Sequence, residues 1–579
     1  MKKYSILLSV FATVSLLVGC QNEIDIDKSP TSGTTFTASI EETSETRTSL
    51  KENSSGYDVM WTTNDEININ GAVFSTSSDE TKTASFTLKS GADPTSPYKA
   101  YYPASIYNGG TPVLPAEQTY AADNINGYPM YAESETENLN FKNLCGILRL
   151  NLGTTMSGIK VKKIIVSADQ GMSGLFTIMS NAAVVSGTAG VTLNCPTEGV
   201  AIGPTAATPF YIAVPANTYT RLNIILIATD GTNEYRQDLT LKPDKSIKVE
   251  RSKISDIHLT CDLSLVLSAG GKNANTYIYS AAGRYCFDAT VKGNGGLDPI
   301  TNAVATKLSG ISGVTVLWEL YSQGRAIKYD PSSAYDISYS NGYVYFRSPE
   351  TFIPGDAYIA VYKDGEGGTA KQYDKANDEI LWSWLIWATP EPGTISHNSK
   401  DFMDRNLGGI EVDNCIRGFL YQWGRKDPFS AANGGYSPYP FIPAISSAFS
   451  RNVSIQSMAY TIAHPTTFIY LGNRAWMSES EYAMKFWNDD VKTIYDPCPY
   501  GWRVPTKGNI DGISGLPATG LTDGNFNSTP FHGFGNPERG YYRISTQSAY
   551  PKALSFCNDG RNLMDWETDT GYAIRPVKE

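Results

Sequence analysis

The sequence predicts a mainly β protein, with tandem β-sandwich domains followed by a C-terminal domain of mixed α and β structure. Only 18% of its 579 residues are charged, whereas it contains 51 glycines and 36 tyrosines. This composition favours strands joined by many turns, because tyrosine is enriched in strands and glycine in turns. A chain of this length is too long for one hydrophobic core and should divide into several domains.

An export signal is predicted at residues 1–19. Lys2 and Lys3 precede an apolar run over 6–18, which is too short for a stable membrane-spanning helix. The run ends at Leu17-Val18-Gly19-Cys20, which resembles the recognition sequence of bacterial lipoprotein maturation. That resemblance implies cleavage after residue 19 and acylation of Cys20. The alternative is an ordinary signal peptide followed by an incidental cysteine.

Residues 20–33 form a polar stretch without helical or strand periodicity, which predicts a flexible lipid tether. Its acidic start is similar to the signals that send lipoproteins of the Bacteroides group to the outer face of the outer membrane. The net charge of −11 argues against nucleic-acid binding, which depends on basic patches that displace counterions.

Short alternating runs fill the next part of the chain. In the first run, Phe36, Ala38 and Ile40 alternate with polar residues, which predicts a strand with one apolar face. Similar runs separated by turn residues follow at strand-like spacing. We therefore expect one β-sandwich at 34–152 and a second at 153–262.

Six short motifs occur in order across roughly residues 34–262, and together they resemble the fimbrillin family of Bacteroides-type pilins. They are Thr46-Arg47-Thr48, Trp61 with Asn64-Asp65-Glu66-Ile67, Ala100-Tyr101-Tyr102-Pro103, Phe141-Lys142-Asn143-Leu144-Cys145-Gly146-Ile147-Leu148, Ile212-Ala213-Val214-Pro215 and Arg251-Ser252-Lys253-Ile254. The resemblance implies transthyretin-like β-sandwiches that assemble into a pilus on the cell surface.

Arg47 lies after the first predicted strand, in a Thr-, Ser- and Glu-rich stretch of the kind that proteases reach easily. In the fimbrillin family an Arg-directed protease cuts in this region, and loss of the first strand opens a groove that accepts a strand from the neighbouring subunit. The resemblance implies this role for Arg47, with Phe36, Ala38 and Ile40 on the removable strand. A solvated loop arginine is the alternative.

A third β-sandwich-like module is predicted at 263–393, and the Pro-rich stretch that ends at Gly393 marks its boundary. Residues 394–579 resemble a paralogous C-terminal module of secreted Fibrobacter and Bacteroides proteins, which is distantly similar to C-type lectins. The matching motifs include Tyr421-Gln422-Trp423-Gly424-Arg425-Lys426-Asp427-Pro428-Phe429 and Asp496-Pro497-Cys498-Pro499-Tyr500-Gly501-Trp502. Within this module Ser478 and Glu481 form a capping box, which predicts a helix reaching toward Trp487.

Tryptophan is concentrated late in the chain, because nine of the ten lie after residue 300. Their aromatic faces suit sugar or protein surfaces, and we name Trp423, Trp476 and Trp566 as candidate ligand-binding residues. Burial in the core is the alternative for each. The run Trp487-Asn488-Asp489 spells a calcium-ligand tripeptide of C-type lectins, but it lacks a clear partner motif and we attribute it to chance.

Motifs of catalysis and metal binding are missing. The four histidines are more than sixty residues apart, and the chain contains no HExxH, CxxC or GxSxG motif and no phosphate-binding glycine loop. We therefore predict no enzyme activity, no catalytic residue, no metal and no cofactor. The cysteines other than Cys20 are too scattered for a disulfide framework. Cys261 with Cys286, or Cys498 with Cys557, are the pairings we consider, and buried free thiols are the alternative.

Together these observations predict an adhesive pilus subunit at the cell surface, in the tip or an accessory position because the chain continues far beyond its second sandwich. Its expected partners are other pilin subunits, through donor-strand exchange, the outer membrane, through the lipid, and a glycan or protein of a host or bacterial surface. The rival hypothesis is a stand-alone surface lipoprotein that binds or degrades glycans.

Overall fold

The computed structural model describes most of the chain from residue 33 onward. The described ranges are 33–41, 51–53, 56–58, 60–108, 110–122, 124–125, 127–242, 244–320, 325–330, 334–365, 372–397, 399–410, 418–429, 441–442, 445–472, 474–510, 541–557 and 563–579. Two compact units are present, of which the first comprises 1–112 with 127–143 and the second 113–126 with 144–579.

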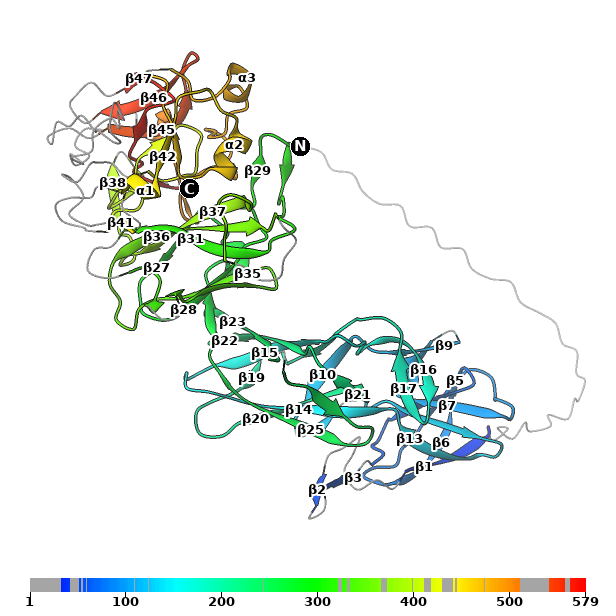
Figure 1. Cartoon of the computed structure of the whole chain (residues 1–579). Coiled ribbons are helices and arrows are strands. Elements are labelled where there is room, and N and C mark those ends of the chain that lie inside the picture. The colour runs from blue at the N-terminus through cyan, green and yellow to red at the C-terminus, as the bar shows by residue number, and fades with distance from the viewer. Residues whose placement is uncertain are drawn as a thin grey trace, which may run out of the picture. The chain divides into compact units, whose positions relative to one another are not determined.

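The predicted fold class, mainly β, is confirmed (Figure 1). Strands dominate both units in the described part of the chain, and the α-helices there have only four to six residues. None of the helices among these residues has the length and apolar character needed to cross a bilayer.

The first unit is a closed barrel in which the strands follow the order β1, β13, β12, β7, β4, β5, β6. Its elements are β1 (Thr35–Ile40), β2 (Lys51–Asn53), β3 (Gly56–Asp58), β4 (Glu66–Ile69), β5 (Ala72–Ser75), β6 (Thr83–Ser90), β7 (Tyr98–Tyr102), a 3-10 helix (Ala104–Ile106), β8 (Tyr107–Asn108), β12 (Met130–Ser134) and β13 (Asn138–Asn143). Alternate residues of the barrel strands β1, β4, β5, β6, β7, β12 and β13 point inward and form one apolar core with Trp61.

The boundary of this unit lies earlier than the predicted residue 152. The segment Cys145–Thr154 is β14, which pairs with β20 (Thr208–Pro215) and β25 (Ile254–Cys261) of the second unit along its whole length. The alternation of apolar and polar residues correctly predicted a strand here. Its partner strands begin more than fifty residues later, and the local pattern of a strand does not determine which sheet it joins. The segment 113–126 also belongs to the second unit, which the sequence did not indicate.

Residues 144–262, together with the segment 113–126, form a β-sandwich within the second unit. One sheet has the order β20, β14, β25, and the other begins β11, β10, β18, β15, β22, β23. Leu148, Phe210, Ile164 and Leu226 come from the two sheets and share one core. The strands are β9 (Thr111–Leu114), β10 (Glu117–Ala121), β11 (Asn124–Ile125), β14 (Cys145–Thr154), β15 (Lys160–Ser167), β16 (Gly174–Met179), β17 (Ala182–Val185), β18 (Val191–Asn194), β19 (Val200–Ala201), β20 (Thr208–Pro215), β21 (Asn217–Tyr219), β22 (Asn223–Thr229), β23 (Glu234–Thr240), β24 (Ile247–Val249) and β25 (Ile254–Cys261).

The third module is joined to this sandwich by a continuous sheet, since the short β26 pairs with β23 on one side and with β28 on the other. Its second sheet has the order β27, β37, β36, β31, β41. The elements are β26 (Ser264–Val266), a 3-10 helix (Ala269–Gly271), β27 (Thr276–Tyr279), β28 (Arg284–Asp288), β29 (Leu297–Asp298), β30 (Ala303–Val304), β31 (Gly313–Leu320), β32 (Tyr329–Asp330), β33 (Ala334–Tyr335), β34 (Ile337–Ser340), β35 (Tyr343–Arg347), β36 (Gly355–Lys363) and β37 (Glu379–Ala388).

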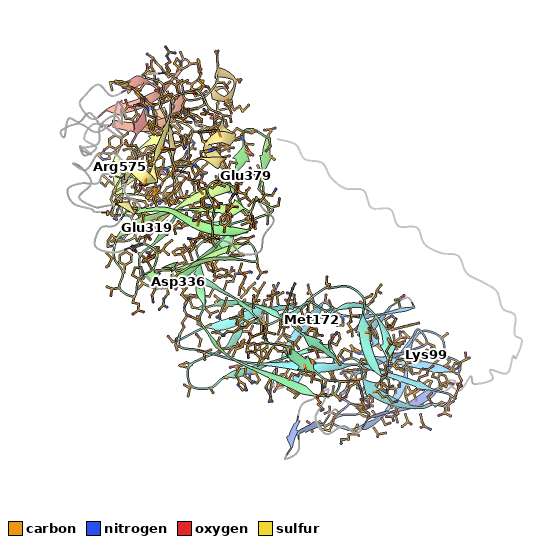
Figure 2. The ribbon with its side chains drawn as sticks, viewed as in Figure 1. Lys99, Met172, Glu319, Asp336, Glu379 and Arg575 are labelled. Carbon is orange, nitrogen blue, oxygen red and sulfur yellow. The ribbon has the colours of Figure 1, made fainter. Side chains whose placement is uncertain are left out.

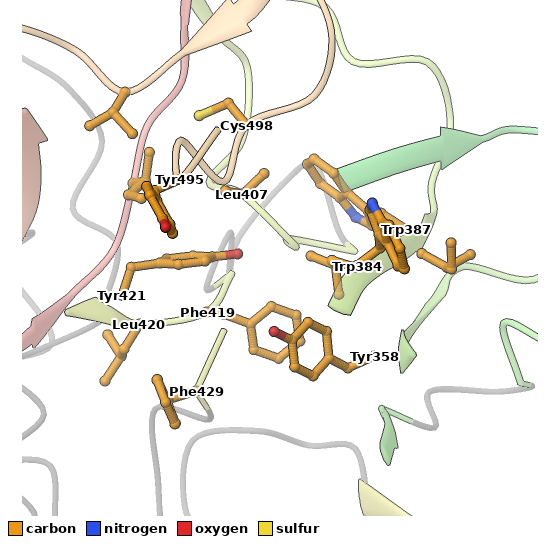
Figure 3. Close-up of a cluster of buried hydrophobic side chains, with 14 of the residues drawn as sticks. Tyr358, Trp384, Trp387, Leu407, Phe419, Leu420, Tyr421, Phe429, Tyr495 and Cys498 are labelled. Atoms are coloured by element: carbon orange, nitrogen blue, oxygen red, sulfur yellow. The ribbon is translucent and has the colours of Figure 1, made fainter. Parts of the chain in front are cut away.

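Residues 394–579 do not form a compact unit of their own. One buried cluster runs from Tyr277 to Val577, so the third module and the C-terminal module share a core across the predicted boundary at 393. Figure 3 shows part of it, with Tyr358, Trp384 and Trp387 before that boundary and Phe419 and Tyr421 after it. In the same core the amide of Asn275 donates to the carbonyl of Ile494 at 2.6 Å.

The C-terminal module consists of small sheets and short helices. They are β38 (Thr394–His397), β39 (Lys400–Met403), β40 (Tyr421–Gln422), β41 (Phe441–Ile442), α1 (Ile445–Ala448), β42 (Ser450–Asn452), α2 (Met458–Ala463), β43 (Thr467–Ile469), α3 (Glu479–Tyr482), β44 (Trp502–Arg503), α4 (Lys507–Ile510), β45 (Tyr541–Gln547), β46 (Lys552–Cys557), β47 (Leu563–Glu567), β48 (Gly571–Tyr572) and β49 (Val577–Lys578). The predicted N-cap is present, because Ser478 Oγ accepts a hydrogen bond from the Glu481 amide at 3.3 Å, whereas the Glu481 carboxylate accepts from the Met458 amide at 3.0 Å. The helix ends at Tyr482, well before the predicted Trp487.

The suggested disulfides are wrong wherever the structure tests them. Cys261, Cys286 and Cys498 are all free and buried. Burial raises the pKa of the Cys261 thiol to about 11, so this group is an inert core residue.

Candidate functional site: the first strand and its groove

The first strand, β1, is held by backbone pairing on both of its edges. It runs parallel to β13, with Ala38 opposite Leu139, and antiparallel to β6, with Ala38 opposite Ala84. It therefore closes the barrel. Without β1, the edges of β6 and β13 that face it would lose their partners.

The side chains of β1 alternate as the sequence predicted. Phe36 and Ala38 are completely buried and Ile40 is 6% exposed, whereas Thr35 and Thr37 face solvent. The Phe36 ring makes edge-on contacts with Phe74 at 5.0 Å and with Tyr98 at 4.9 Å between ring centroids. Burial of Phe36 and Ile40 contributes about 1.5–3 kcal/mol each to holding the strand in place.

Trp61 contacts the middle of β1 from the barrel interior. Its indole Nε1 donates to the carbonyl of Ala38 at 3.0 Å. The ring is completely buried and packs edge-on against Phe86, Tyr102 and Phe141. The Trp61 motif is thus part of the floor of the groove that β1 fills.

The polar residues that follow Trp61 fix the turn after it. Tyr102 Oη donates to Asp65 Oδ1 at 2.7 Å, and the Thr62 amide donates to Asp65 Oδ2 at 2.8 Å. Burial raises the pKa of the Asp65 carboxyl, although these hydrogen bonds oppose the shift. Asn64 adopts a positive φ of 71°, which asparagine tolerates better than most residues. Two motifs that are forty residues apart in sequence therefore converge on one turn.

Two predicted site residues, Cys20 and Arg47, lie outside the described residues. Arg47 falls in the segment between Glu41, whose amide donates to Phe141 O at 2.8 Å, and the β2–β3 hairpin that begins at Lys51. Chain cleavage in this segment would leave β1 attached to the barrel by non-covalent contacts alone.

The edges of β6 and β13 set the requirements for any strand that occupies the place of β1. A strand that replaces β1 would need backbone donors and acceptors for β6 and β13, together with apolar side chains at every second position. The positions of Phe36, Ala38 and Ile40 define that spacing. Most of the contacts made by β1 are backbone hydrogen bonds and apolar packing, which other alternating sequences could also supply.

Two of the three candidate tryptophans prove to be core residues. Trp423 and Trp476 are completely buried, and the indole of Trp423 donates to Ser545 O at 3.0 Å while that of Trp476 donates to Trp423 O at 2.9 Å. Neither ring has a face free for a ligand. Trp566 is partly buried in β47, with its ring centroid 6.1 Å from that of Tyr572.

Sequence reasoning missed a buried charge cluster formed by Arg425, Lys426 and Asp427, which directly follow Trp423-Gly424. Asp427 accepts from the Arg425 guanidinium at 2.7 Å and from the Lys426 ammonium at 2.9 Å. Across the shared core, Tyr358 Oη donates to Asp427 Oδ1 at 2.8 Å, and Lys426 also contacts Ser383 Oγ. The cluster links the C-terminal module to β36 and β37.

Burial and pairing shift the pKa values in this cluster. Burial lowers the pKa of Lys426, although Asp427 opposes the shift. Burial alone would raise the pKa of Asp427, but the charges of Lys426 and Arg425 outweigh it and hold that pKa below its usual range. Arg425, Lys426 and Asp427 belong to the motif that resembles the secreted paralogous module, and they therefore lie buried in the interior of the C-terminal module. A charge run in a sequence gives no sign of burial, so only the packed structure reveals this role.

A second buried carboxyl in the C-terminal core belongs to Asp356 in β36. It is completely buried, neither oxygen has a hydrogen-bond partner, and burial raises its pKa far above the usual range. Its cross-strand neighbours are Leu320 and Trp387. Arg575, labelled in Figure 2, is also buried, and its Nε and one terminal nitrogen have no acceptor.

Comparisons with known proteins give little direct guidance. No family model matches the chain, and no curated protein matches it. Among solved structures, it is similar to a proposed cell adhesion protein from Bacteroides ovatus, with 14% identity, 39% of this chain and 91% of that chain covered and a TM-score of 0.24. It is also similar to a fimbrial protein from the same species, with 11% identity, coverage of 39% and 48% and a TM-score of 0.20. The tip fimbrial protein Mfa3 from Porphyromonas gingivalis matches with 12% identity, coverage of 34% and 92% and a TM-score of 0.17. Values this low do not establish a shared family.

Proposed function

We propose that this chain is an adhesive subunit of a bacterial surface pilus, and that its N-terminal barrel accepts a strand from a neighbouring subunit in place of β1. The observation that carries the proposal is the position of β1. It closes the barrel between β6 and β13, and the segment that follows it contains Arg47. The ordered motifs from Arg47 to Ile254 support the same interpretation through their resemblance to fimbrillins.

Cleavage after Arg47 would have two consequences in this scheme. It would free β1 to leave the groove, and it would separate acylated Cys20 from the rest of the chain. The lipid would then deliver the subunit to the outer membrane, and the strand of a neighbour would hold the mature subunit afterwards.

A tip or accessory position is supported by the last described strand. β49 pairs with β39 and β44 inside its own module, and Val577 is 1% exposed. That strand is therefore already engaged and is poorly suited to donation. The C-terminal half, which shares one core, would act as the adhesive head, and the partly buried Trp566 is a candidate contact residue on it.

The test is limited digestion of the full chain with an Arg-specific endoprotease, followed by intact mass measurement and size-exclusion chromatography with light scattering. We expect a cut after Arg47, release of the N-terminal fragment and formation of oligomers. Arg47→Ala should abolish all three, whereas Arg221→Ala, which removes an exposed arginine elsewhere in the chain, should change none of them.

Peptide competition tests the groove itself. A synthetic peptide of residues 34–41 should block oligomer formation, and the same peptide with Phe36→Ser and Ile40→Ser should not. A cleaved chain that stays monomeric while it binds a polysaccharide would contradict the pilus proposal and favour the stand-alone glycan-binding or glycan-degrading lipoprotein.

A further inference from the structure

The C-terminal module contains an open pocket of about 700 Å³. Three stretches that are distant in sequence meet there, namely 399–401, 489–509 and 578–579. The lining residues are Ser399, Lys400, Asp401, Asp489, Asp490, Val491, Lys492, Arg503, Thr506, Asn509, Lys578 and Glu579. Polar groups from separate segments thus converge on one hollow, which is the usual anatomy of a small-ligand site.

Several lining side chains are held in place by internal contacts. The Lys492 ammonium contacts Glu579 Oε1 at 2.9 Å and donates to Pro499 O at 3.0 Å. Asp489 Oδ2 accepts from Thr546 Oγ1 at 2.7 Å, and its other oxygen accepts from Ser545. These contacts give part of the wall a fixed orientation, which reduces the entropy lost when a ligand binds.

Other lining groups keep hydrogen-bonding capacity. Within the described part of the chain, the side chains of Lys400 and Asp490 are exposed and make no hydrogen bond or ion pair. Arg503 donates through one terminal nitrogen to Asn488 O at 2.5 Å, but its Nε–H is buried without an acceptor. The pocket therefore offers the Lys400 ammonium as a donor and the Asp490 carboxylate as an acceptor, together with the aliphatic side chain of Val491, which is 48% exposed.

The charges of the lining cancel. Its cations are Lys400, Lys492, Arg503 and Lys578, and its carboxylates are Asp401, Asp489, Asp490 and Glu579. A strongly anionic or cationic ligand would meet repulsion from half of these groups. A neutral polyhydroxylated ligand uses both kinds, because each hydroxyl donates to a carboxylate and accepts from an ammonium or guanidinium.

From this balance we propose that the pocket binds a neutral sugar unit of a surface glycan, with Asp490 and Lys400 contacting its hydroxyls and Val491 contacting a C–H face. The inference rests on the proposed adhesive function and names its ligand class. It also gives Asp489, from the tripeptide that we attributed to chance, a place in the wall of a binding site.

The experiment applies the full chain to an array of neutral, sialylated and sulfated oligosaccharides, and measures the affinity for the best neutral oligosaccharide by titration calorimetry. We expect binding to neutral glycans, weakened at least tenfold by Asp490→Asn and by Lys400→Ala. Asp565→Asn removes an exposed carboxylate outside the pocket and should leave the affinity unchanged. Matching thermal unfolding curves for all variants would show that the fold is intact.

Three results would overturn the assignment: no binding to any neutral glycan, a preference for the sialylated or sulfated ones, or neutral binding that both pocket variants retain. Oligomer formation after Arg-specific cleavage is scored on the same samples. Loss of sugar binding with normal oligomers, or the reverse, separates failure of the pocket assignment from failure of the pilus proposal.

Discussion

The N-terminal barrel and the C-terminal core are closed by different kinds of contact. In the barrel, β1 is held by backbone hydrogen bonds, by apolar side chains and by one indole hydrogen bond to Ala38. In the C-terminal core, Asp427 joins two buried cations and Tyr358. Backbone pairing and alternating apolar residues are generic, whereas a buried ion cluster accepts only its own partners. The first kind of contact could be made by another alternating strand, as the proposed strand exchange requires, whereas the second can be made only by these residues.

The largest expected effect comes from removing the centre of the ion cluster. Asp427→Ala leaves Lys426 and Arg425 buried without their carboxylate, and we expect the free energy of unfolding of the C-terminal core to fall by about 3–5 kcal/mol. Urea unfolding followed by tryptophan fluorescence measures it, since nine of the ten tryptophans lie in this half. If Asp427→Ala lowered the free energy of unfolding by less than about 1 kcal/mol, as the control Asp565→Asn should, the ion cluster would not be what holds the C-terminal core together. The contrast with the barrel would then be wrong.

Asp356 should make the same core sensitive to pH. Because its folded pKa is raised, the stability it contributes is complete below its unfolded pKa of about 4 and is lost as the pH rises toward its folded pKa, at about 1.4 kcal/mol per pH unit. Asp356→Asn should flatten this dependence and raise the melting temperature at pH 7.4. Melting curves between pH 4 and 8 measure both, and an unchanged slope would show that another group governs the dependence.

A smaller effect is expected in the barrel. Trp61→Phe keeps a ring in the groove floor but removes the hydrogen bond to Ala38 O, and we expect the barrel to lose about 1–3 kcal/mol. After Arg47 cleavage, a labelled peptide of residues 34–41 should exchange into the barrel faster than in the wild type. The unfolding transition of the C-terminal core should be unchanged in this variant. A shift of that transition would mean that the barrel and the C-terminal core do not unfold independently.

The smallest effect concerns the cap of α3. Ser478→Ala removes the acceptor of the Glu481 amide, which should cost about 1 kcal/mol in the C-terminal transition. Ser478→Asp retains an acceptor and should restore most of it. Equal loss in both variants would show that the hydroxyl acts through some other contact.

Local features of the sequence predicted local features of the structure. The alternation of Phe36, Ala38 and Ile40 gave the buried face of β1, and the Ser478–Glu481 spacing gave the start of α3. Both depend on residues within a few positions of one another. The end of α3 and the boundary of the first unit at Asn143 depend on distant segments, and both lie earlier in the chain than the sequence suggested. Trp423 and Trp476 follow the alternative stated for them, burial in the core.

By itself, the sequence determined that this is a mainly β chain, where its first strand lies and which face of that strand is apolar, because periodicity and turn residues act over short distances. Only the tertiary structure decided that β14 pairs with β20 and β25, that residues on both sides of 393 share one core, and that Arg425, Lys426 and Asp427 lie inside it. These outcomes depend on which segments, far apart in the sequence, pack against each other and become buried from water. No short stretch of sequence carries that information.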